Sequence, residues 1–155
     1  MKTSLLKFFC LFVVLLFLQG CTIAQRVVRI DSNKEISKIY VLKNDKVLME
    51  GFHPELISQL NALGFETETY SGDVPTAATY YINYTANWKW ELAMYLEYFK
   101  AAVYEQGSES GFAKLLGEVE YDATNGGGNF DKFGDTADKI KPLLQELFAK
   151  VKRKQ

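Results

Sequence analysis

Three acidic residues at alternate positions, Glu118, Glu120 and Asp122, are the side chains whose types and spacing could do chemistry. Because side chains alternate along a strand, the three carboxylates would project from one face of a strand within 115–123. Such a row could bind a hard cation or act as an acid pair. A solvated strand face explains the same spacing, and we favour this interpretation.

The only histidine, His53, stands directly before Pro54 at a predicted helix start. A histidine without cysteines or carboxylates at ligand spacing is a poor metal ligand or general base, so a capping or surface role is expected. We therefore predict no catalytic residue, no metal site and no cofactor. The alternative is an envelope enzyme that uses His53 or the three carboxylates.

A second group of candidates is apolar and aromatic. These residues fall in two long strands predicted over 79–89 and 92–105 and could form a binding surface for a lipid, a glycan or a partner protein: Trp88, Trp90, Tyr95, Leu96 and Tyr98. Core packing under helices is the other interpretation. Strict alternation along the second strand would leave an apolar patch on the open face of the sheet, made of Met94, Leu96, Tyr98, Ala102 and Tyr104. A β-bulge near Glu97 would instead exchange the faces and bury more of them.

The charge pattern argues against a nucleic-acid partner. The 155 residues carry a formal net charge of −1 and a pI near 5.9, and the one basic run is at the C-terminus. Phosphate binding needs a clustered basic surface. We expect no nucleic-acid binding.

The first 21 residues have the pattern of a targeting segment. Lys2 and Lys7 flank the start of an apolar run, Phe8 to Leu18, which is shorter than the roughly 20 residues of a membrane-spanning helix. The run ends in Leu-Gln-Gly before Cys21, which resembles a bacterial lipobox. This resemblance implies cleavage after residue 20, acylation of Cys21 and, with Thr22 next, an outer-membrane protein whose domain faces the periplasm. An ordinary secretory signal is the alternative.

The elements that must position these residues suggest a single domain. We predict a flexible tether over 21–35 with a short strand at 26–30, then an α+β domain over 36–155. Its predicted order is β-α-β-β-β-β-α. Strands are expected at 36–43, 65–70, 79–89, 92–105 and 115–123, and helices after Pro54 and after Asp135. The expected fold is a two-layer sandwich with a five-stranded, mostly antiparallel sheet and both helices on one face.

Three segments of the chain resemble the Sbal-type family of small uncharacterised lipoproteins of Gram-negative bacteria: KIYVLKNDKVLMEGFHPELISQLNALG, YTANWKWELAMYLEYFKAAVYE and GEVEYDATNGGGNFDKFGDTADKIKPLLQELF. The resemblance implies an envelope location and an α+β domain, without catalytic residues to transfer. Together with the anchor it favours a non-enzymatic binding or envelope-assembly module, held to the membrane by its lipid, with an envelope protein or a second copy as partner.

Overall fold

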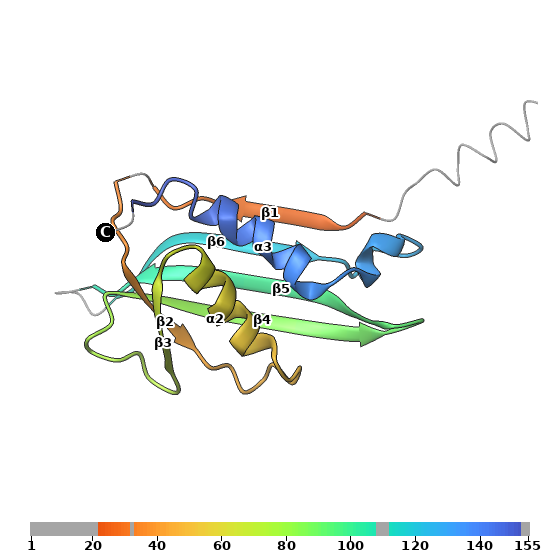
Figure 1. Ribbon diagram of the computed structural model, residues 1–155, viewed down its shortest axis with the longest axis horizontal. Coiled ribbons are helices and arrows are strands. Elements are labelled where there is room, and N and C mark those ends of the chain that lie inside the picture. Colours follow the sequence, from red (N-terminus) through yellow and green to blue (C-terminus); the bar gives the residue numbers. More distant parts are fainter. Residues whose placement is uncertain (1–21, 32, 108–111, 153–155) are drawn as a thin grey trace, which may run out of the picture.

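The computed structural model describes residues 22–31, 33–107 and 112–152. The predicted signal peptide and the predicted lipidation of Cys21 lie outside the described residues. The described chain forms one α+β unit in which a mixed sheet is covered by two helices (Figure 1).

The sheet has six strands in the order β1-β6-β5-β4-β2-β3. Their bounds are Ala24–Val28 (β1), Lys38–Leu42 (β2), Glu66–Tyr70 (β3), Tyr80–Trp90 (β4), Met94–Glu105 (β5) and Lys114–Asp122 (β6). β2 runs parallel to both β3 and β4, and the other neighbours are antiparallel. The α+β class is thus confirmed, while the prediction of five strands is one too few.

The sixth strand, β1, comes from the segment predicted as a tether. It pairs with β6 from Ala24–Asp122 to Val28–Glu118, two residues earlier than the short strand predicted at 26–30. Ile30, just after β1, is fully buried, and its N–H donates to the carbonyl of Leu147 at 3.1 Å. This segment is therefore packed into the domain, because Ile30 is buried next to β6 and the C-terminal helix.

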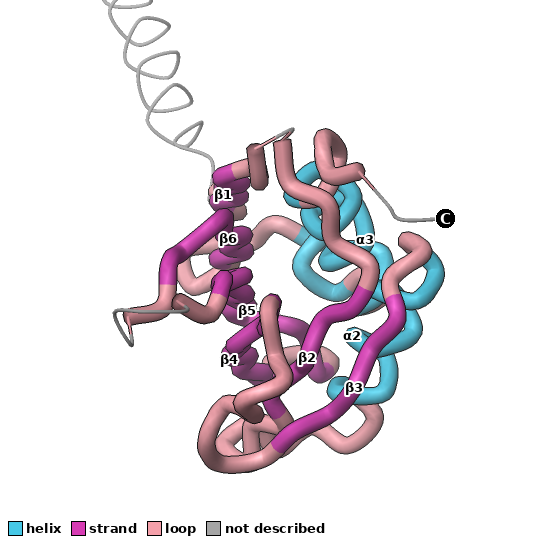
Figure 2. The backbone as a smooth tube through the Cα atoms, turned by 90° about the vertical axis from the view of Figure 1, so that its left-hand side faces the viewer, coloured by secondary structure: helices cyan, strands magenta, loops and turns pink. Residues whose placement is uncertain are grey.

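Both helices lie on the same face of the sheet (Figure 2). α2 spans Phe52–Ala62 and connects the parallel strands β2 and β3. α3 spans Thr136–Leu147, and its N-cap is Asp135, whose carboxylate accepts from the N–H of Ala137 at 2.8 Å. A short 3₁₀ turn, η1 (Phe130–Phe133), precedes α3.

The main core fills the space between the helices and the sheet. Its sheet side includes Ile39, Val41, Ile82, Phe99 and Val103. A smaller cluster on the opposite side of the sheet consists of Tyr40, Tyr70, Ala78 and Tyr81. Because Ala78 lies in the loop before β4, that loop covers part of the open face.

A β-bulge lies at Glu97. Asn87 pairs with Tyr98, but its neighbour Trp88 pairs with Leu96, so Glu97 is the extra residue. As a result Leu96 and Phe99 both lie in the core, fully buried. The bulge alternative is thus confirmed, and the prediction that Leu96 lies on an exposed binding surface is wrong.

At Gly117 in β6 the chain segment that contains β1 and the helix α3 both approach the backbone closely, which leaves no room for a side chain. A Cβ at this position would lie 2.6 Å from the carbonyl oxygen of Val28 and 2.9 Å from both Ile30 Cγ1 and Leu147 Cδ1. We predict that Gly117→Ala lowers the free energy of unfolding by about 1–3 kcal/mol, measured in urea, because overpacking forces backbone to shift. Gly128→Ala is the matched control, since nothing lies within 4 Å of that Cβ. Equal stability of the two variants would contradict the observed packing of β1.

Candidate functional site

Large apolar side chains are exposed together at one end of the domain, which we call the hairpin end. This end holds the β4–β5 turn and η1 (Figure 1), and residues of the loop between β2 and α2 line a pocket with Trp88 and Met94. Trp90 is 70%, Leu92 80% and Phe130 75% exposed. Met94, beside Trp90, and Leu48, in the loop, are exposed as well. Isolated exposed apolar residues are ordinary, but a group at one end indicates a contact surface.

The β4–β5 hairpin projects because its neighbours stop short of the turn. β6 pairs with β5 only as far as the Asp122–Tyr98 pair, and the last β2 pair with β4 is Val41–Ile82. Beyond these rows the N–H of Ala123 still donates to the carbonyl of Glu97 at 2.8 Å, and the two long strands then continue as a pair up to Trp90–Met94. The tip therefore reaches into solvent as a two-stranded ribbon.

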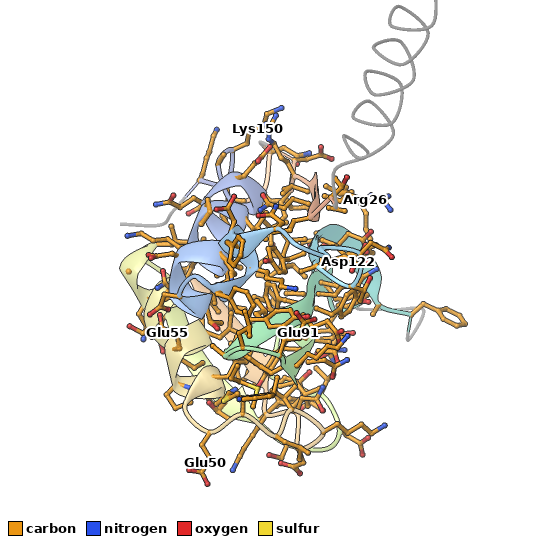
Figure 3. All side chains as sticks on the ribbon, turned by 90° about the vertical axis from the view of Figure 1, so that its right-hand side faces the viewer. Arg26, Glu50, Glu55, Glu91, Asp122 and Lys150 are labelled. Carbon is orange, nitrogen blue, oxygen red and sulfur yellow. The ribbon has the colours of Figure 1, made fainter. Side chains whose placement is uncertain are left out.

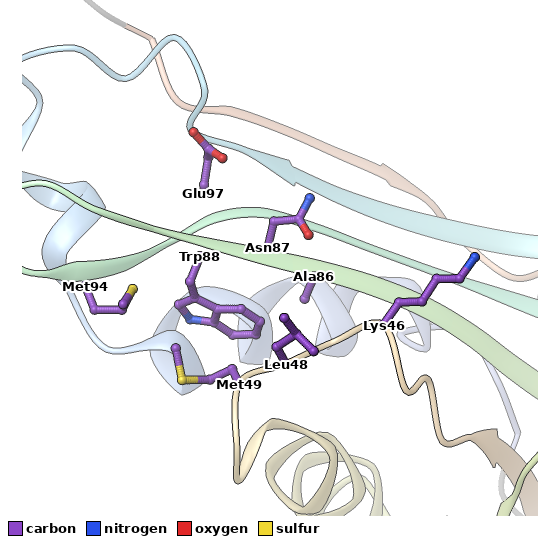
Figure 4. Close-up of a pocket in the computed structure, with 8 residues that line it drawn as sticks. All are labelled: Lys46, Leu48, Met49, Ala86, Asn87, Trp88, Met94 and Glu97. Carbon is purple, nitrogen blue, oxygen red and sulfur yellow. The ribbon is translucent and has the colours of Figure 1, made fainter.

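Trp88 separates two hollows at this end. One, of about 500 Å³, is open and has a largely apolar lining; Figure 4 shows its residues: Lys46, Leu48, Met49, Ala86, Asn87, Trp88, Met94 and Glu97. The second, of about 490 Å³, shares Met49, Trp88 and Met94 and continues to the start of α3. The indole packs edge-on against Phe52, with ring centroids 4.9 Å apart, and its N–H donates to Thr136 Oγ1 at 3.4 Å.

Ion pairs hold the charged side chains next to the β4–β5 turn. Lys132 of η1 is only 2% exposed, and its Nζ donates to Glu91 Oε2 and to the carbonyl of Gly127, both at 2.5 Å. The same ammonium lies 5.0 Å from the ring centroid of Tyr95 and 5.2 Å from that of Phe133. Figure 3, which looks onto this end, shows Glu91 near the centre of the face.

Glu91 is the carboxylate that Lys132 and Tyr95 together stabilise. The hydrogen bond from Lys132, and then that from the Tyr95 hydroxyl at 2.9 Å, hold the pKa of Glu91 below its usual value. Burial and the neighbouring Glu91 raise the pKa of Tyr95 to about 12. Nearby, Lys89 pairs with Glu97 at 3.5 Å. The carboxylates next to the tip thus have counter-charges.

The structure divides the predicted binding residues among four places. Trp90 is exposed at the tip and Trp88 is half-buried beside the hollows. Tyr95 and Leu96 are buried, so they belong to the core and not to a surface. Tyr98 is half-buried, and its hydroxyl donates to Glu120 Oε1 at 2.8 Å. Leu48, Leu92 and Phe130 were not among the predicted residues, because nothing in their spacing shows that three separate connections meet at one end.

The three predicted carboxylates have partners on β5, β1 and their own turn. Glu118 lies 3.1 Å from Lys100 and 3.8 Å from Arg26, and Glu120 accepts from Tyr98. Asp122 accepts from the N–H and the hydroxyl of Thr124, at 2.8 and 2.5 Å. Within the described residues, no three histidine, cysteine or acidic side chains gather closely enough to hold a metal ion.

His53 lies at the start of α2 between two hydroxyls. Its Nδ1 lies 3.0 Å from Tyr84 Oη, and its Nε2 lies 3.0 Å from Thr69 Oγ1. Burial, with a smaller effect from Lys43, lowers the pKa of His53. A neutral imidazole held by two hydroxyls, and stacked on the Tyr84 ring, has a structural role at this helix start.

The comparisons with known proteins identify a shared fold only. No protein-family model matches the chain, and no curated protein does. Among solved structures, a dodecamer of a PelC variant from Paraburkholderia phytofirmans superposes with a TM-score of 0.52 at 10% identity, over 86% of this chain and all of the PelC chain. A second crystal form of the PelC dodecamer gives 0.48 at 9% identity over the same shares. None of the helices in 22–31, 33–107 and 112–152 is long and apolar enough to cross a membrane.

Proposed function

We propose that this chain is an outer-membrane lipoprotein whose domain faces the periplasm and serves as a non-enzymatic binding or envelope-assembly module. One observation carries the proposal: most of the large exposed apolar side chains of the described residues gather at the end of the domain from which the chain leads back to Cys21, while Val28, Phe112 and Leu115 are exposed elsewhere. A module fixed to a membrane at this end meets its partners there, and an apolar surface suits contact better than catalysis.

The position of the N-terminus follows from strand pairing. One row of paired residues crosses four strands: Ala24, Asp122, Tyr98 and Asn87. β1 therefore begins at the same end of the sheet as the β4–β5 turn, as Figure 1 also shows. An acylated Cys21, three residues before Ala24, would hold this end towards the membrane.

Self-assembly is part of the proposal. β1 and β3 are the edge strands of the sheet, and each pairs with one neighbour within the described domain. Open edges are templates for pairing with another chain. A solved structure that shares the fold, the PelC variant, is that of a dodecamer. We infer that copies of this domain associate through these edges on the membrane.

An enzymatic role has less support. It would require Glu118, Glu120, Asp122 or His53 to face a substrate. All four already interact with groups of the same domain, at 2.5–3.8 Å. The binding role therefore agrees better with the geometry, and we propose no reaction.

Cross-linking in intact cells tests the assembly role. A photo-reactive residue placed at Gln25 in β1 or at Glu68 in β3, both exposed edge positions, should yield covalent dimers and higher species in the outer-membrane fraction. The same group at Lys141, exposed on α3, is the control and should yield monomer. Monomer alone from both edge positions, in protein that reaches the outer membrane, would contradict assembly through the edges.

A further inference from the structure

The tip of the β4–β5 hairpin carries three exposed apolar side chains, Trp90, Leu92 and Met94. They are close in sequence, and the strand pairing of Trp90 with Met94 holds two of them side by side. We propose that this tip lies in the interfacial region of the membrane that holds Cys21. The inference rests on the proposed function, because it uses the same lipid anchor, and it names the bilayer as the partner of this surface.

The reach of the chain allows the tip and the anchor to lie at the same height. From Ala24 back to Cys21 there are three residues, which span at most about 10 Å. From Asn87, in the same row as Ala24, to Trp90 there are also three residues, and a strand rises about 10 Å over that length. Three strand spacings separate β1 from β4 across the sheet, which is roughly 14 Å. When Cys21 lies at the headgroups, the tip lies beside it.

The chemistry of the tip suits a bilayer surface. Tryptophan favours the membrane–water boundary, where its ring is apolar and its N–H remains hydrated. Leucine and methionine next to it add area that can enter the acyl boundary. Phe130, on η1 at the same end, is exposed as well.

The electrostatics of the tip reduce the cost of approaching lipid. Glu91, in the turn itself, is paired with Lys132, and Lys89 is paired with Glu97. Unpaired charges would oppose entry into a region of low dielectric constant, whereas paired charges lose less hydration energy. The turn can therefore approach the headgroups without exposing a lone carboxylate.

The tip contributes little to the fold, which makes the proposal directly testable. Trp90, Leu92 and Met94 lie outside the two buried clusters, so serine at Leu92 or Met94 should leave the melting temperature nearly unchanged. The two tryptophans of the chain, Trp88 and Trp90, differ in position. One is half-buried against the core and the other is at the tip.

Fluorescence quenching by brominated lipids measures the contact. The processed chain, which begins at Cys21 and contains no other cysteine, is coupled through its thiol to a maleimide lipid in phosphatidylcholine vesicles with bromines on the acyl chains. In the Trp88→Phe variant, Trp90 is the only tryptophan. Compared with the same variant without vesicles, the emission of Trp90 should shift to shorter wavelength, and its intensity should fall severalfold. In the Trp90→Phe variant, Trp88 should be quenched much less. If Trp88→Phe fails to fold, the quenching of Trp90 is obtained instead as the difference in quenching between the wild type and Trp90→Phe.

Two results would overturn the inference. One is unchanged Trp90 emission in protein tethered to brominated vesicles. The other is a concentration-dependent shift of Trp90 emission without vesicles that Leu92→Ser abolishes, since a second copy would then occupy the tip. The maleimide tether replaces the natural acyl chains, so absence of lipidation in cells would remove the proposed function and leave this test unaffected.

Discussion

Replacing Cys21 with serine is expected to release the domain from the outer membrane. Acylation requires the cysteine thiol, and the processed chain has no second cysteine that could accept a lipid. Two or three acyl chains at one site anchor a protein stably, whereas a single chain is marginal. A hairpin tip of three apolar side chains buries less than one such chain. We therefore expect nearly all of the Cys21→Ser protein in the soluble periplasmic fraction, or as uncleaved precursor at the inner membrane.

Labelled palmitate and membrane fractionation measure this effect. Cys10→Ser is the matched control, because Cys10 lies within the segment that cleavage would remove, and this variant should still take up palmitate. The lipoprotein proposal fails if Cys21→Ser continues to fractionate with the outer membrane and the wild type takes up no palmitate.

Local sequence signals predicted the regular elements well. β-branched and aromatic residues without proline indicated the two long strands, which the structure has at Tyr80–Trp90 and Met94–Glu105. Pro54 indicated a helix start, and the structure has α2 at Phe52–Ala62. These signals depend only on residues that are close in the chain, so they can be recognised in a single sequence.

Features that depend on distant partners were missed or left open. β1 is short, and its burial pattern is mostly exposed; only the edge of β6 makes it a strand. Lys132 can be buried because its ammonium group donates to Glu91 and to the carbonyl of Gly127. Nothing in the spacing of these residues predicts the two hydrogen bonds. The bulge at Glu97 was one of two alternatives, since a one-residue shift leaves the composition of the strand unchanged.

The candidate surface also combines residues that local sequence signals predicted with residues that only the fold brings together. Trp88 and Trp90 were proposed together, and as residues two apart in β4 they share a face. Only the ribbon geometry beyond the ends of β2 and β6 decides that Trp90 is exposed while Trp88 is half-buried. Leu48, Leu92 and Phe130 join them from three connections. A contact surface made of loop tips is assembled by the fold as a whole, so sequence periodicity cannot identify it.

The Leu96→Ser substitution is expected to cause the largest loss of stability among the changes considered. Leu96 is fully buried within the main core. The change removes most of an apolar side chain, leaves a cavity and adds a buried hydroxyl group without a hydrogen-bond partner. Large-to-small changes in a core cost about 2–5 kcal/mol, and a buried unpaired hydroxyl adds about 1–3 kcal/mol. We expect a loss of roughly 3–8 kcal/mol, which would lower the melting temperature by about 10 °C or more.

Tyr98→Phe is the matched comparison for this substitution, because Tyr98 lies two positions away across the bulge. Tyr98 is half-buried, and its hydroxyl bonds to Glu120, so the phenylalanine keeps the ring and loses one hydrogen bond worth about 1 kcal/mol. Thermal melting followed by circular dichroism should therefore rank wild type, Tyr98→Phe and Leu96→Ser in order of falling stability. If Leu96→Ser instead melts at the temperature of the wild type, Leu96 faces solvent, the strand alternates without a bulge, and the apolar patch predicted on the open face becomes the binding surface.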